Sequence, residues 1–596
     1  MCGILGRWNF GKPIDKEVFN RMRDTLIHRG PDGFGTWIHD NGNLALGHRR
    51  LSFLDLSSAG AQPICNENKS IWLTVNGEIY NYLELREELR NKGHVFKSDT
   101  DSEVIVHAWE EWGTEMLPRL EGMFAFGLWD ENRKELILAR DRYGIKPLYY
   151  CLNNNEMLFA SELKAFAADP GIPRVIDPAA FCNYFTYRYI PSPQTIYKNI
   201  YKLEPGQCAV FKTQGDFSLS FYFSPATDNV KMGINEAAEI AGELLHSSVR
   251  RHIRSDVPVG SFLSGGYDSS ALVKYFSKEQ PGFNTFSAGF EGWDMSEHHF
   301  ANKVSSVYGT RSHELIIGTN DYEVLPELMF NYDEPIADIS ILPTYLISQL
   351  AAAHNKTVLS GEGADEIFAG YTWHRPYLWD ITKKQLREAR KYHWEIPANR
   401  YDVESYSRAM AMGMFRHSDF KEFISPEWYQ YIPEDTWWFY RKHYDNSLPA
   451  PKSFQLLDIR TFMGELVLTK IDRASMAHSL EVRVPFLDNK LVDFMLSLDP
   501  DVYFSLKKQK VLLYKLLKKD LPKQILQRKK QGFVGPDDYY KNIQFYTHYL
   551  GESMLSKAGV VNQNYINKLM SEGDYWRLWK ICIMELWWRK WNPSID

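Results

Sequence analysis

The chain has 596 residues, more than one hydrophobic core usually holds, so at least two domains are expected. Its 69 Lys and Arg against 75 Asp and Glu give a formal net charge of -6, which argues against a nucleic-acid surface. Six scattered cysteines without a CxxC pair argue against a disulfide scaffold or a structural metal. The start of the chain does not resemble a signal peptide, and no apolar run is long enough to span a bilayer. We therefore expect a cytoplasmic protein that binds neither nucleic acid nor membranes.

The N-terminal third consists of short apolar or alternating segments separated by Gly, Asn and Asp, a pattern typical of strands in stacked antiparallel sheets. Helical periodicity is confined there to a few stretches, such as 82–92 and 102–112. This part predicts an antiparallel β-sandwich flanked by helices. The polar segment 212–231, which contains Gly, Ser, Asp and Asn, predicts a linker.

Strands and helices alternate after this segment. A helix is predicted over 234–253, a strand over 257–263, and then a Gly-rich turn that leads into a helix over 269–276. Further strands are predicted at 285–289 and 356–359, with a helix at 297–308 between them. This alternation predicts a parallel α/β sheet with covering helices. The remainder is mostly helical, and a stripe of Trp, Ile and Leu at its end has the spacing of core packing.

Cys2 directly follows the initiator methionine. Removal of Met1 would leave a cysteine with a free α-amine, whose unperturbed pKa of about 7.7–8.0 makes it a usable base at neutral pH. A single residue would then supply both a nucleophilic thiol and a general base.

Five ordered motifs give Cys2 a context. They are His28-Arg29-Gly30-Pro31-Asp32-Gly33, Gly47-His48-Arg49-Arg50-Leu51-Ser52, Val75-Asn76-Gly77-Glu78-Ile79-Tyr80-Asn81, Ser98-Asp99-Thr100-Asp101-Ser102-Glu103, and the run from Ala139 to Tyr150. With Cys2, this series resembles the class II glutamine amidotransferase domain, an N-terminal nucleophile hydrolase, over residues 2–210.

The resemblance implies a role for each residue that follows. Cys2 would attack the side-chain amide of glutamine, and the Asn76 amide with the Gly77 N–H would form the oxyanion hole. Arg50 would bind the α-carboxylate of glutamine, and Glu78 and Asp101 would hold its α-ammonium group.

A second constellation follows the strand predicted at 257–263. The turn Ser264-Gly265-Gly266-Tyr267-Asp268-Ser269-Ser270 would let backbone N–H groups approach phosphate closely at the start of a helix. It lacks the GxxxxGK[ST] pattern of Walker-type loops. It resembles the pyrophosphate-binding loop of ATP pyrophosphatases, in which Ser264 and Ser269 would contact pyrophosphate and Asp268 would bind Mg²⁺.

Further segments extend the resemblance to residues 230–596. They are Asp333-Glu334-Pro335, the run from Ser360 to Tyr371, and the runs Lys470 to Ser479 and Leu480 to Asp488. Together they resemble the synthetase domain of the asparagine synthetase family. The resemblance implies that Asp365 is a second Mg²⁺ ligand and that Glu362 assists ammonia attack. It also implies that the nucleotide site is lined by Leu263, Ala288, Ser360 and Gly361.

A basic segment, Lys507-Lys508-Gln509-Lys510, lies where the family has a lysine followed by x-Leu-Leu-Arg. Lys510 aligns with that lysine and would stabilise the charged transition state of adenylation, with Lys507 as a neighbouring candidate. Tyr514 replaces the usual arginine.

The resemblance implies that glutamine yields ammonia in one domain, which passes inside the protein to the other. There ATP would activate a carboxylate as an adenylate, with Mg²⁺ and with release of AMP and pyrophosphate. Aspartate is the default acceptor. A sugar uronate stays an alternative acceptor, because the aromatic and basic segment Thr372–Tyr377 follows the acidic loop. A homodimer is common in the family.

Two functions of a different class would also fit parts of the sequence. A catalytically silent binding or regulatory protein on this fold is disfavoured, because Cys2, Asn76, Asp268 and Asp365 are all intact. A sugar-phosphate aminotransferase would share only the N-terminal domain and would need no ATP, so the glycine-rich turn after 257–263 argues against it.

Overall fold

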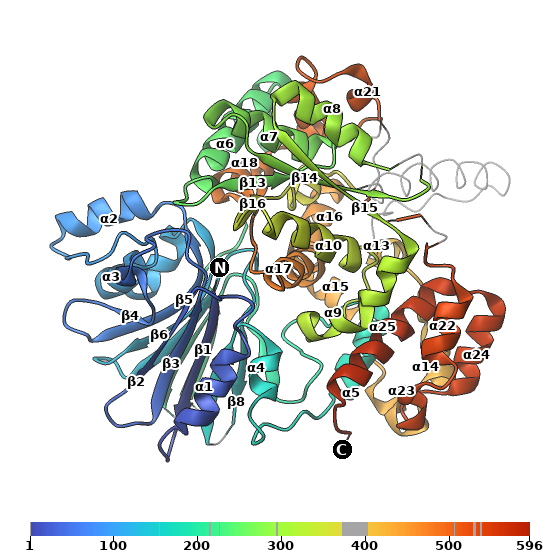
Figure 1. Cartoon of the computed structure of the whole chain (residues 1–596), viewed down its shortest axis with the longest axis horizontal. Coiled ribbons are helices and arrows are strands. Elements are labelled where there is room, and N and C mark those ends of the chain that lie inside the picture. Colours follow the sequence, from blue (N-terminus) through green and yellow to red (C-terminus); the bar gives the residue numbers. More distant parts are fainter. Residues whose placement is uncertain are drawn as a thin grey trace.

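The computed structural model describes residues 2–153, 155–213, 216–225, 227–293, 296–371, 403–505, 507–528, 532–533, 535–536 and 539–595. Two antiparallel sheets form the N-terminal half, a parallel sheet lies beside one end of them, and a helical region completes the molecule (Figure 1). The N-terminus lies near the centre of this view, where the antiparallel sheets approach the rest of the chain.

The first sheet has six strands in the order β10-β8-β9-β1-β3-β2, and every neighbouring pair is antiparallel. Its strands are β1 (Gly3–Asn9), β2 (Gly33–Ile38), β3 (Leu44–Arg50), β8 (Tyr149–Leu152), β9 (Glu156–Ala160) and β10 (Ile200–Lys202).

The second sheet also has six strands, in the antiparallel order β12-β11-β7-β6-β5-β4. Its strands are β4 (Ile64–Cys65), β5 (Ile71–Ile79), β6 (Gly122–Asp130), β7 (Glu135–Arg140), β11 (Gln207–Thr213) and β12 (Asp216–Phe221).

The two sheets pack face to face through a shared apolar core. Side chains of the first sheet, such as Ile4 and Phe159, join those of the second, such as Leu138. Gly6 and Gly127 leave room for the ring of Phe159, because a Cβ atom on either would lie 2.0 or 2.1 Å from that ring. The alternating pattern of the sequence therefore produces the predicted sandwich.

Helices cover the outer faces of the sandwich, as predicted. Helix α1 (Lys16–Asp24) and helix α4 (Leu163–Ala167) contribute to the core outside the first sheet, and α2 (Tyr82–Asn91) and α3 (Glu103–Trp112) to the core outside the second.

The prediction of a linker over residues 212–231 is wrong for the first part of this segment. Strand β12 lies within this segment and pairs with β11 in register from Gln207↔Phe221 to Phe211↔Phe217. All six residues of β12 are exposed, so the polar composition reflects a solvated edge strand.

The third sheet has five parallel strands in the order β15-β14-β13-β16-β17. They are β13 (Val259–Phe262), β14 (Asn284–Phe290), β15 (Arg311–Ile317), β16 (Thr357–Leu359) and β17 (Glu481–Arg483). The strand order reverses between β13 and β16, which makes the carboxyl ends of these two strands the topological switch point of the sheet. The predicted parallel sheet is confirmed, although its two edge strands, β15 and β17, were not predicted.

Helices cover both faces of this sheet. One core contains residues of α6 (Ile234–His252), α7 (Tyr267–Glu279), α8 (His298–Tyr308), α18 (Asn489–Ser497) and α20 (Val511–Leu517). The core on the other face contains residues of α10 (Ile341–Ala352) and α17 (Thr469–Met476).

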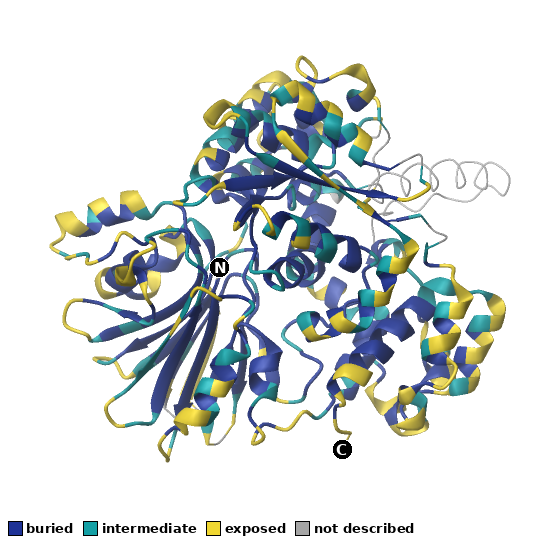
Figure 2. Cartoon of the chain, viewed as in Figure 1, coloured by how far each residue is buried: buried dark blue, intermediate teal, exposed yellow. Residues whose placement is uncertain are grey.

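The helical region includes α5 (Pro178–Tyr187), α9 (Leu325–Tyr332), α13 (Val403–Met410), α14 (His417–Phe423), α22 (Ile543–Leu550), α24 (Gln563–Glu572) and α25 (Tyr575–Trp591). Helix α25 is buried along most of its length, whereas the outward faces of α2 and α24 are exposed (Figure 2). Trp579 and Trp587, from the stripe noted in the sequence, are each at most 1% exposed, so this stripe is core.

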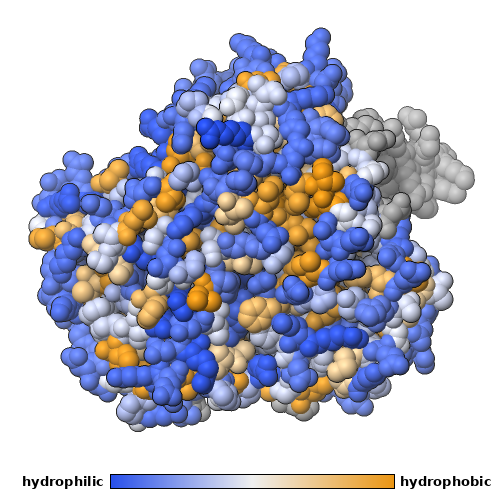
Figure 3. Space-filling model, viewed as in Figure 1, coloured by the Kyte–Doolittle hydropathy of each residue, from blue (hydrophilic) through white to orange (hydrophobic). Residues whose placement is uncertain are grey.

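On the face shown in Figure 3, hydrophilic side chains cover most of the outline and apolar side chains gather nearer the centre. Within the described ranges, no helix has both the length and the apolar character that crossing a bilayer requires.

Candidate functional site

Cys2 directly precedes β1, an inner strand of the first sheet, and lies against Asn76 of β5 in the second sheet. The backbone N–H of Cys2 donates a hydrogen bond of 2.9 Å to Oδ1 of Asn76. Asn76 is fully buried, and its Nδ2 has no hydrogen-bond partner among the residues that the structure describes. An unpaired buried donor is costly unless a ligand uses it, so Nδ2 is suited to bind a substrate oxygen. Burial raises the pKa of the Cys2 thiol.

Gly77 follows Asn76 in β5 and packs against β6 without room for a side chain. A Cβ atom there would lie 2.1 Å from the carbonyl oxygen of Met123 and 2.6 Å from Cα of Phe124. The glycine therefore lets β5 and β6 approach closely beside the position of Asn76.

Arg50 ends β3, whose residue Arg49 pairs with Gly3 directly after Cys2. Its guanidinium group donates a 2.8 Å hydrogen bond to the carbonyl of Ser57 and a second one to the carbonyl of Asp55. The loop after β3 therefore holds the guanidinium group near the start of β1.

Glu78, two residues after Asn76 in β5, forms a buried acidic pair with Asp101. A carboxylate oxygen of Asp101 accepts a 2.7 Å hydrogen bond from the N–H of Ile79, the residue after Glu78. Burial and the charge of Asp101 raise the pKa of Glu78 well above its ordinary value, and burial also raises the pKa of Asp101. Two adjacent buried carboxyl groups favour a cationic partner, such as the ammonium group of an amino acid.

The second half of the chain contributes Arg483 to this acidic pair, which the motifs did not predict. Arg483 lies in β17 and is fully buried, and its Nη2 is 3.3 Å from Oε2 of Glu78. The other guanidinium nitrogens donate to Glu481 at 2.5 Å and to the carbonyls of His252 and Arg254 at 2.6 and 2.8 Å. The predicted glutaminase site is therefore bordered by the parallel sheet.

A second buried connection joins the two halves at Arg29. Its guanidinium group makes a bidentate pair with Asp472 at 2.8 and 3.0 Å and also donates to the carbonyl of Cys2 at 3.0 Å. Glu162 accepts from Arg29 and pairs with Arg473, each at 2.7 Å. The backbone of Cys2 is thus fixed through residues of α17.

The segment Asp333-Glu334-Pro335 also faces the N-terminal half. Asp333 accepts a 3.1 Å hydrogen bond from the N–H of Lys164, and Glu334 pairs with Lys202 at 2.9 Å. This motif and the Lys470–Ser479 motif therefore contribute to the boundary between the halves.

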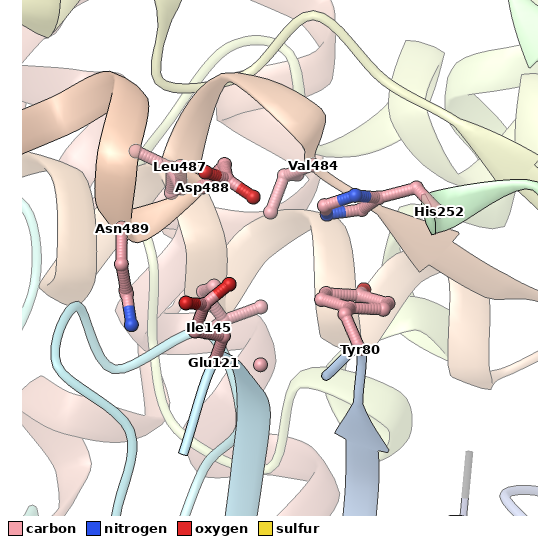
Figure 4. Close-up of a pocket in the computed structure, with 9 residues that line it drawn as sticks. Tyr80, Glu121, Ile145, His252, Val484, Leu487, Asp488 and Asn489 are labelled. Carbon is pink, nitrogen blue, oxygen red and sulfur yellow. The ribbon is translucent and has the colours of Figure 1, made fainter. Parts of the chain in front are cut away.

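A cavity of about 10 Å³ lies at the same boundary (Figure 4). The rings of Tyr80 and His252 pack beside it with centroids 3.8 Å apart. A volume of this size holds about one water molecule and no substrate. Its other lining residues are Glu121, Gly122 and Ile145 from the first half, and Val484, Leu487, Asp488 and Asn489 from the second.

The glycine-rich turn connects β13 to α7 at the switch point of the parallel sheet. Gly265 has a φ of +72°, and a Cβ atom there would lie 2.6 Å from the backbone of Phe300, so only glycine fits. The hydroxyl oxygens of Ser264 and Ser269 lie 3.2 Å apart, and the hydroxyl of Ser264 accepts from the N–H of Gly266 at 3.3 Å. Asp268 lies in the first turn of α7.

The other predicted nucleotide residues gather at neighbouring strand ends. Leu263 follows β13 and donates its N–H to Phe286 at 2.8 Å, and Ala288 lies two residues before the end of β14. Ser360 and Gly361 follow β16, and a Cβ atom on Gly361 would lie 3.1 Å from Cβ of Asp268. The two loops therefore meet where ligands bind in sheets of this kind.

Lys510 joins the two loops through their carboxylates. Its Nζ pairs with Oδ2 of Asp268 and lies 2.8 Å from Oδ1 of Asp365. Burial lowers the pKa of Lys510, but the two carboxylates outweigh burial and raise it. Gly370 makes room for this arrangement, since its Cβ atom would lie 2.0 Å from Cε of Lys510. Two carboxylates that reach one point are a donor set that fits Mg²⁺.

The structure separates the two candidate lysines. Lys507 is exposed and its N–H donates to the hydroxyl of Ser505 at 3.2 Å, whereas Lys510 is 3% exposed. The ring of Tyr514 lies against the ring of Tyr267 of α7, with centroids 6.2 Å apart.

Glu362 follows Gly361 in the same loop. Burial raises the pKa of Glu362, Lys470 opposes this, and Asp365 and Asp268 add to it. The segment Thr372–Tyr377, on which the uronate hypothesis rests, lies outside the described residues.

Comparisons with known proteins agree with this geometry. A family model described as "Glutamine amidotransferase domain" matches residues 1–223, and one described as "Asparagine synthase" matches residues 241–589. The glutamine-hydrolysing asparagine synthetase 1 of Bacillus subtilis is 33% identical over 98% of this chain and 96% of its own length. Asparagine synthetase 3 of the same organism is 31% identical over 89% and 87%. A protein of Gibberella zeae named amidase chry2 is 26% identical over 92% and 89%.

These matches confirm the predicted resemblance and the predicted enzyme class, an amidotransferase that forms a C–N bond. The chain belongs to the glutamine-hydrolysing asparagine synthetase family.

Proposed function

We propose that the chain makes asparagine from aspartate, using glutamine as nitrogen donor and ATP as substrate, with Mg²⁺. The products are AMP, pyrophosphate and glutamate. Residues 2–210 form the glutaminase domain and residues 230–596 the synthetase domain. Strand β12 (Asp216–Phe221) lies after residue 210 and extends a sheet of the first domain as its edge strand. Aspartate as acceptor is supported by the relatives that are named asparagine synthetases.

In the glutaminase domain, removal of Met1 converts the Cys2 nitrogen into the α-amine. This nitrogen lies 2.9 Å from Oδ1 of Asn76, which orients it beside the thiol. The amine takes the thiol proton as Cys2 attacks the glutamine amide, and Nδ2 of Asn76 with the Gly77 N–H stabilises the oxyanion. Arg50 binds the α-carboxylate of glutamine.

Ammonia then crosses the buried boundary between the halves to the synthetase domain. There the Ser264–Ser269 loop and the start of α7 bind the phosphates, and Lys510 offsets the charge that develops as the acceptor carboxylate attacks the α-phosphate. Asp268 and Asp365 would hold Mg²⁺, which neutralises phosphate charge when it is bound. Glu362 assists the attack of ammonia on the adenylate.

The observation that carries this proposal is the meeting of Asp268, Asp365 and Lys510 at the switch point of the parallel sheet. ATP/pyrophosphate exchange, measured with aspartate, uronic acids and nucleotide-linked uronates in turn, tests it. We expect exchange with aspartate and none with uronic acids or nucleotide-linked uronates. Exchange that occurs only with a uronate would contradict aspartate as the acceptor but would still support the adenylation chemistry. We further propose that the enzyme is a cytoplasmic protein and forms a homodimer.

A further inference from the structure

Four side chains with metal-binding atoms, none of them assigned to either site, meet in the N-terminal half. They are Glu67, His94, His107 and Glu110, and one donor atom of each lies within 4.8 Å of the others. His107 and Glu110 belong to α3, whereas Glu67 lies between β4 and β5 and His94 follows α2. Three separate segments of the chain therefore converge on one point.

The ring nitrogens of the His107 side chain are able to bind a ligand. It is fully buried, and neither of its ring nitrogens has a hydrogen-bond partner in the part of the chain that the structure describes. Nδ1 lies 3.5 Å from Oε2 of Glu67, and Nε2 lies 3.6 Å from Oε1 of Glu103. Both distances are longer than an ordinary N–H···O hydrogen bond, so this buried ring faces two carboxylates that stand slightly too far away.

The spacing between the donor atoms suits a tetrahedral ion. Two ligands of a tetrahedral zinc ion, each about 2.0–2.1 Å from the metal, are about 3.4 Å apart. Nδ1 of His107 is 3.5 Å from Glu67, and Nδ1 of His94 is 3.7 Å from Oε2 of Glu110. The four donor atoms all lie within 4.8 Å of one another, so side-chain movements that shorten the longer separations would bring them to bonding distance.

Both histidines also have a carboxylate behind them. Nε2 of His94 lies 3.4 Å from Oε2 of Glu111, just as Nε2 of His107 faces Glu103. A zinc-bound histidine almost always donates its second N–H to a carboxylate, a backbone carbonyl or a water molecule, and a carboxylate is available to each histidine here. Glu103 is itself fixed, since its carboxylate accepts from the N–H groups of Lys97 and Ser98, each at 2.8 Å.

We propose that Glu67, His94, His107 and Glu110 bind a zinc ion, with Glu103 and Glu111 as the outer partners of the two histidines. Two imidazoles and two carboxylates are nitrogen and oxygen ligands that zinc accepts. Four protein ligands leave no open position, so the site is structural and ties the segments of Glu67 and His94 to α3.

The test is metal binding to the full chain, made metal-free with EDTA and studied as the Cys2→Ala variant in excess Mg²⁺. Zinc is titrated by equilibrium dialysis with metal analysis, and Co²⁺ serves as a spectroscopic probe of tetrahedral coordination. We expect one zinc per chain and the absorption of tetrahedral Co²⁺. The Glu111→Gln variant should weaken binding about 10–100-fold.

His94→Gln is the decisive variant, because the side chain of His94 is partly exposed, at 11%, and its loss leaves the core intact. It should abolish stoichiometric zinc binding. His39→Gln is the matched control, since His39 pairs with a single carboxylate, Glu131, at 2.7 Å, and it should bind zinc as the parent does. Absence of stoichiometric zinc binding to the parent would show that the cluster holds no zinc, and zinc binding that survives His94→Gln would show that the zinc binds elsewhere. Either result would overturn the proposal.

Discussion

Nη2 of Arg483, in the parallel sheet, lies 3.3 Å from Oε2 of Glu78, in the antiparallel sandwich. Both side chains are buried. The carbonyl of Arg483 also accepts a 2.8 Å hydrogen bond from the N–H of Ser360 in the nucleotide loop. One residue therefore contacts the predicted glutamine-binding acid with its side chain and the predicted nucleotide site with its backbone.

Replacing Arg483 by methionine should raise the KM for glutamine more than it lowers kcat. Burial and Asp101 raise the pKa of Glu78, and Arg483 opposes them, so the variant should have a still higher Glu78 pKa. The glutamine ammonium group needs the ionised carboxylate, so binding weakens as the pH falls through this pKa. Loss of a charge-assisted contact corresponds to roughly 10–150-fold in KM, about 1.5–3 kcal/mol. In glutaminase kinetics measured from pH 5 to 9, glutamine binding to the variant should begin to weaken at a higher pH than binding to the wild type.

Arg142→Met is the control for this prediction, because Arg142 pairs with Asp493 across the same boundary at 3.3 Å but away from Glu78. It should leave the pH profile of the glutamine KM unchanged. Identical profiles for Arg483→Met and the wild type would mean that Arg483 has only a structural role.

The Cys2→Ala and Asn76→Ala variants should separate the two half-reactions. Cys2→Ala should abolish glutamine hydrolysis, and Asn76→Ala should lower its kcat by about 10²–10³ through loss of one oxyanion donor. Both variants should still synthesise product from free ammonium salts, because the second site lies in the other half of the chain. Parallel assays with glutamine and with ammonium measure this. Loss of ammonia-dependent synthesis in a folded variant would contradict two separate sites.

Substitutions of Lys510 and of Lys507 should differ sharply in their effect on ATP/pyrophosphate exchange. Lys510→Met should lower ATP/pyrophosphate exchange by about 10²–10³, because a charged group that contacts both acidic loops is lost. Lys507→Met removes the same charge from an exposed position three residues away and should have little effect. Equal losses in the two variants would indicate a general electrostatic effect of the basic segment.

Processing at the N-terminus offers an independent check of the nucleophile. Mass spectrometry of the active protein should find the chain beginning at Cys2, since the α-amine is the proposed base. Full glutaminase activity in protein that keeps Met1 would rule out this base.

The sequence predicted those parts of the fold and the candidate site that depend on local pattern. Short apolar or alternating segments indicated the antiparallel sheets of the N-terminal third, and the glycine-rich turn after an apolar run indicated the β13–α7 connection. The grouping of Asp268 with Lys510 was implied by resemblance and not by spacing, because 242 positions separate them. Their contact depends on how α20 packs beside α7.

Other features could not be predicted, because they depend on how the halves pack. Arg29 and Asp472 lie in two motifs 443 positions apart, and only the packed structure shows their bidentate pair. Arg483 was visible in a motif but carried no sign that it reaches Glu78. Strand β12 was interpreted as linker because an exposed edge strand has the composition of a loop.

Isotope tracing with product analysis tests the central claim most directly. The full chain is incubated with amide-¹⁵N glutamine, aspartate, ATP and Mg²⁺, and the products are measured by mass spectrometry and ³¹P NMR. We expect asparagine that carries ¹⁵N in its side-chain amide, with AMP and pyrophosphate formed in equal amounts. Formation of ADP and phosphate would instead indicate an acyl-phosphate route, and the absence of ¹⁵N from the amidated product would contradict transfer of nitrogen between the two sites.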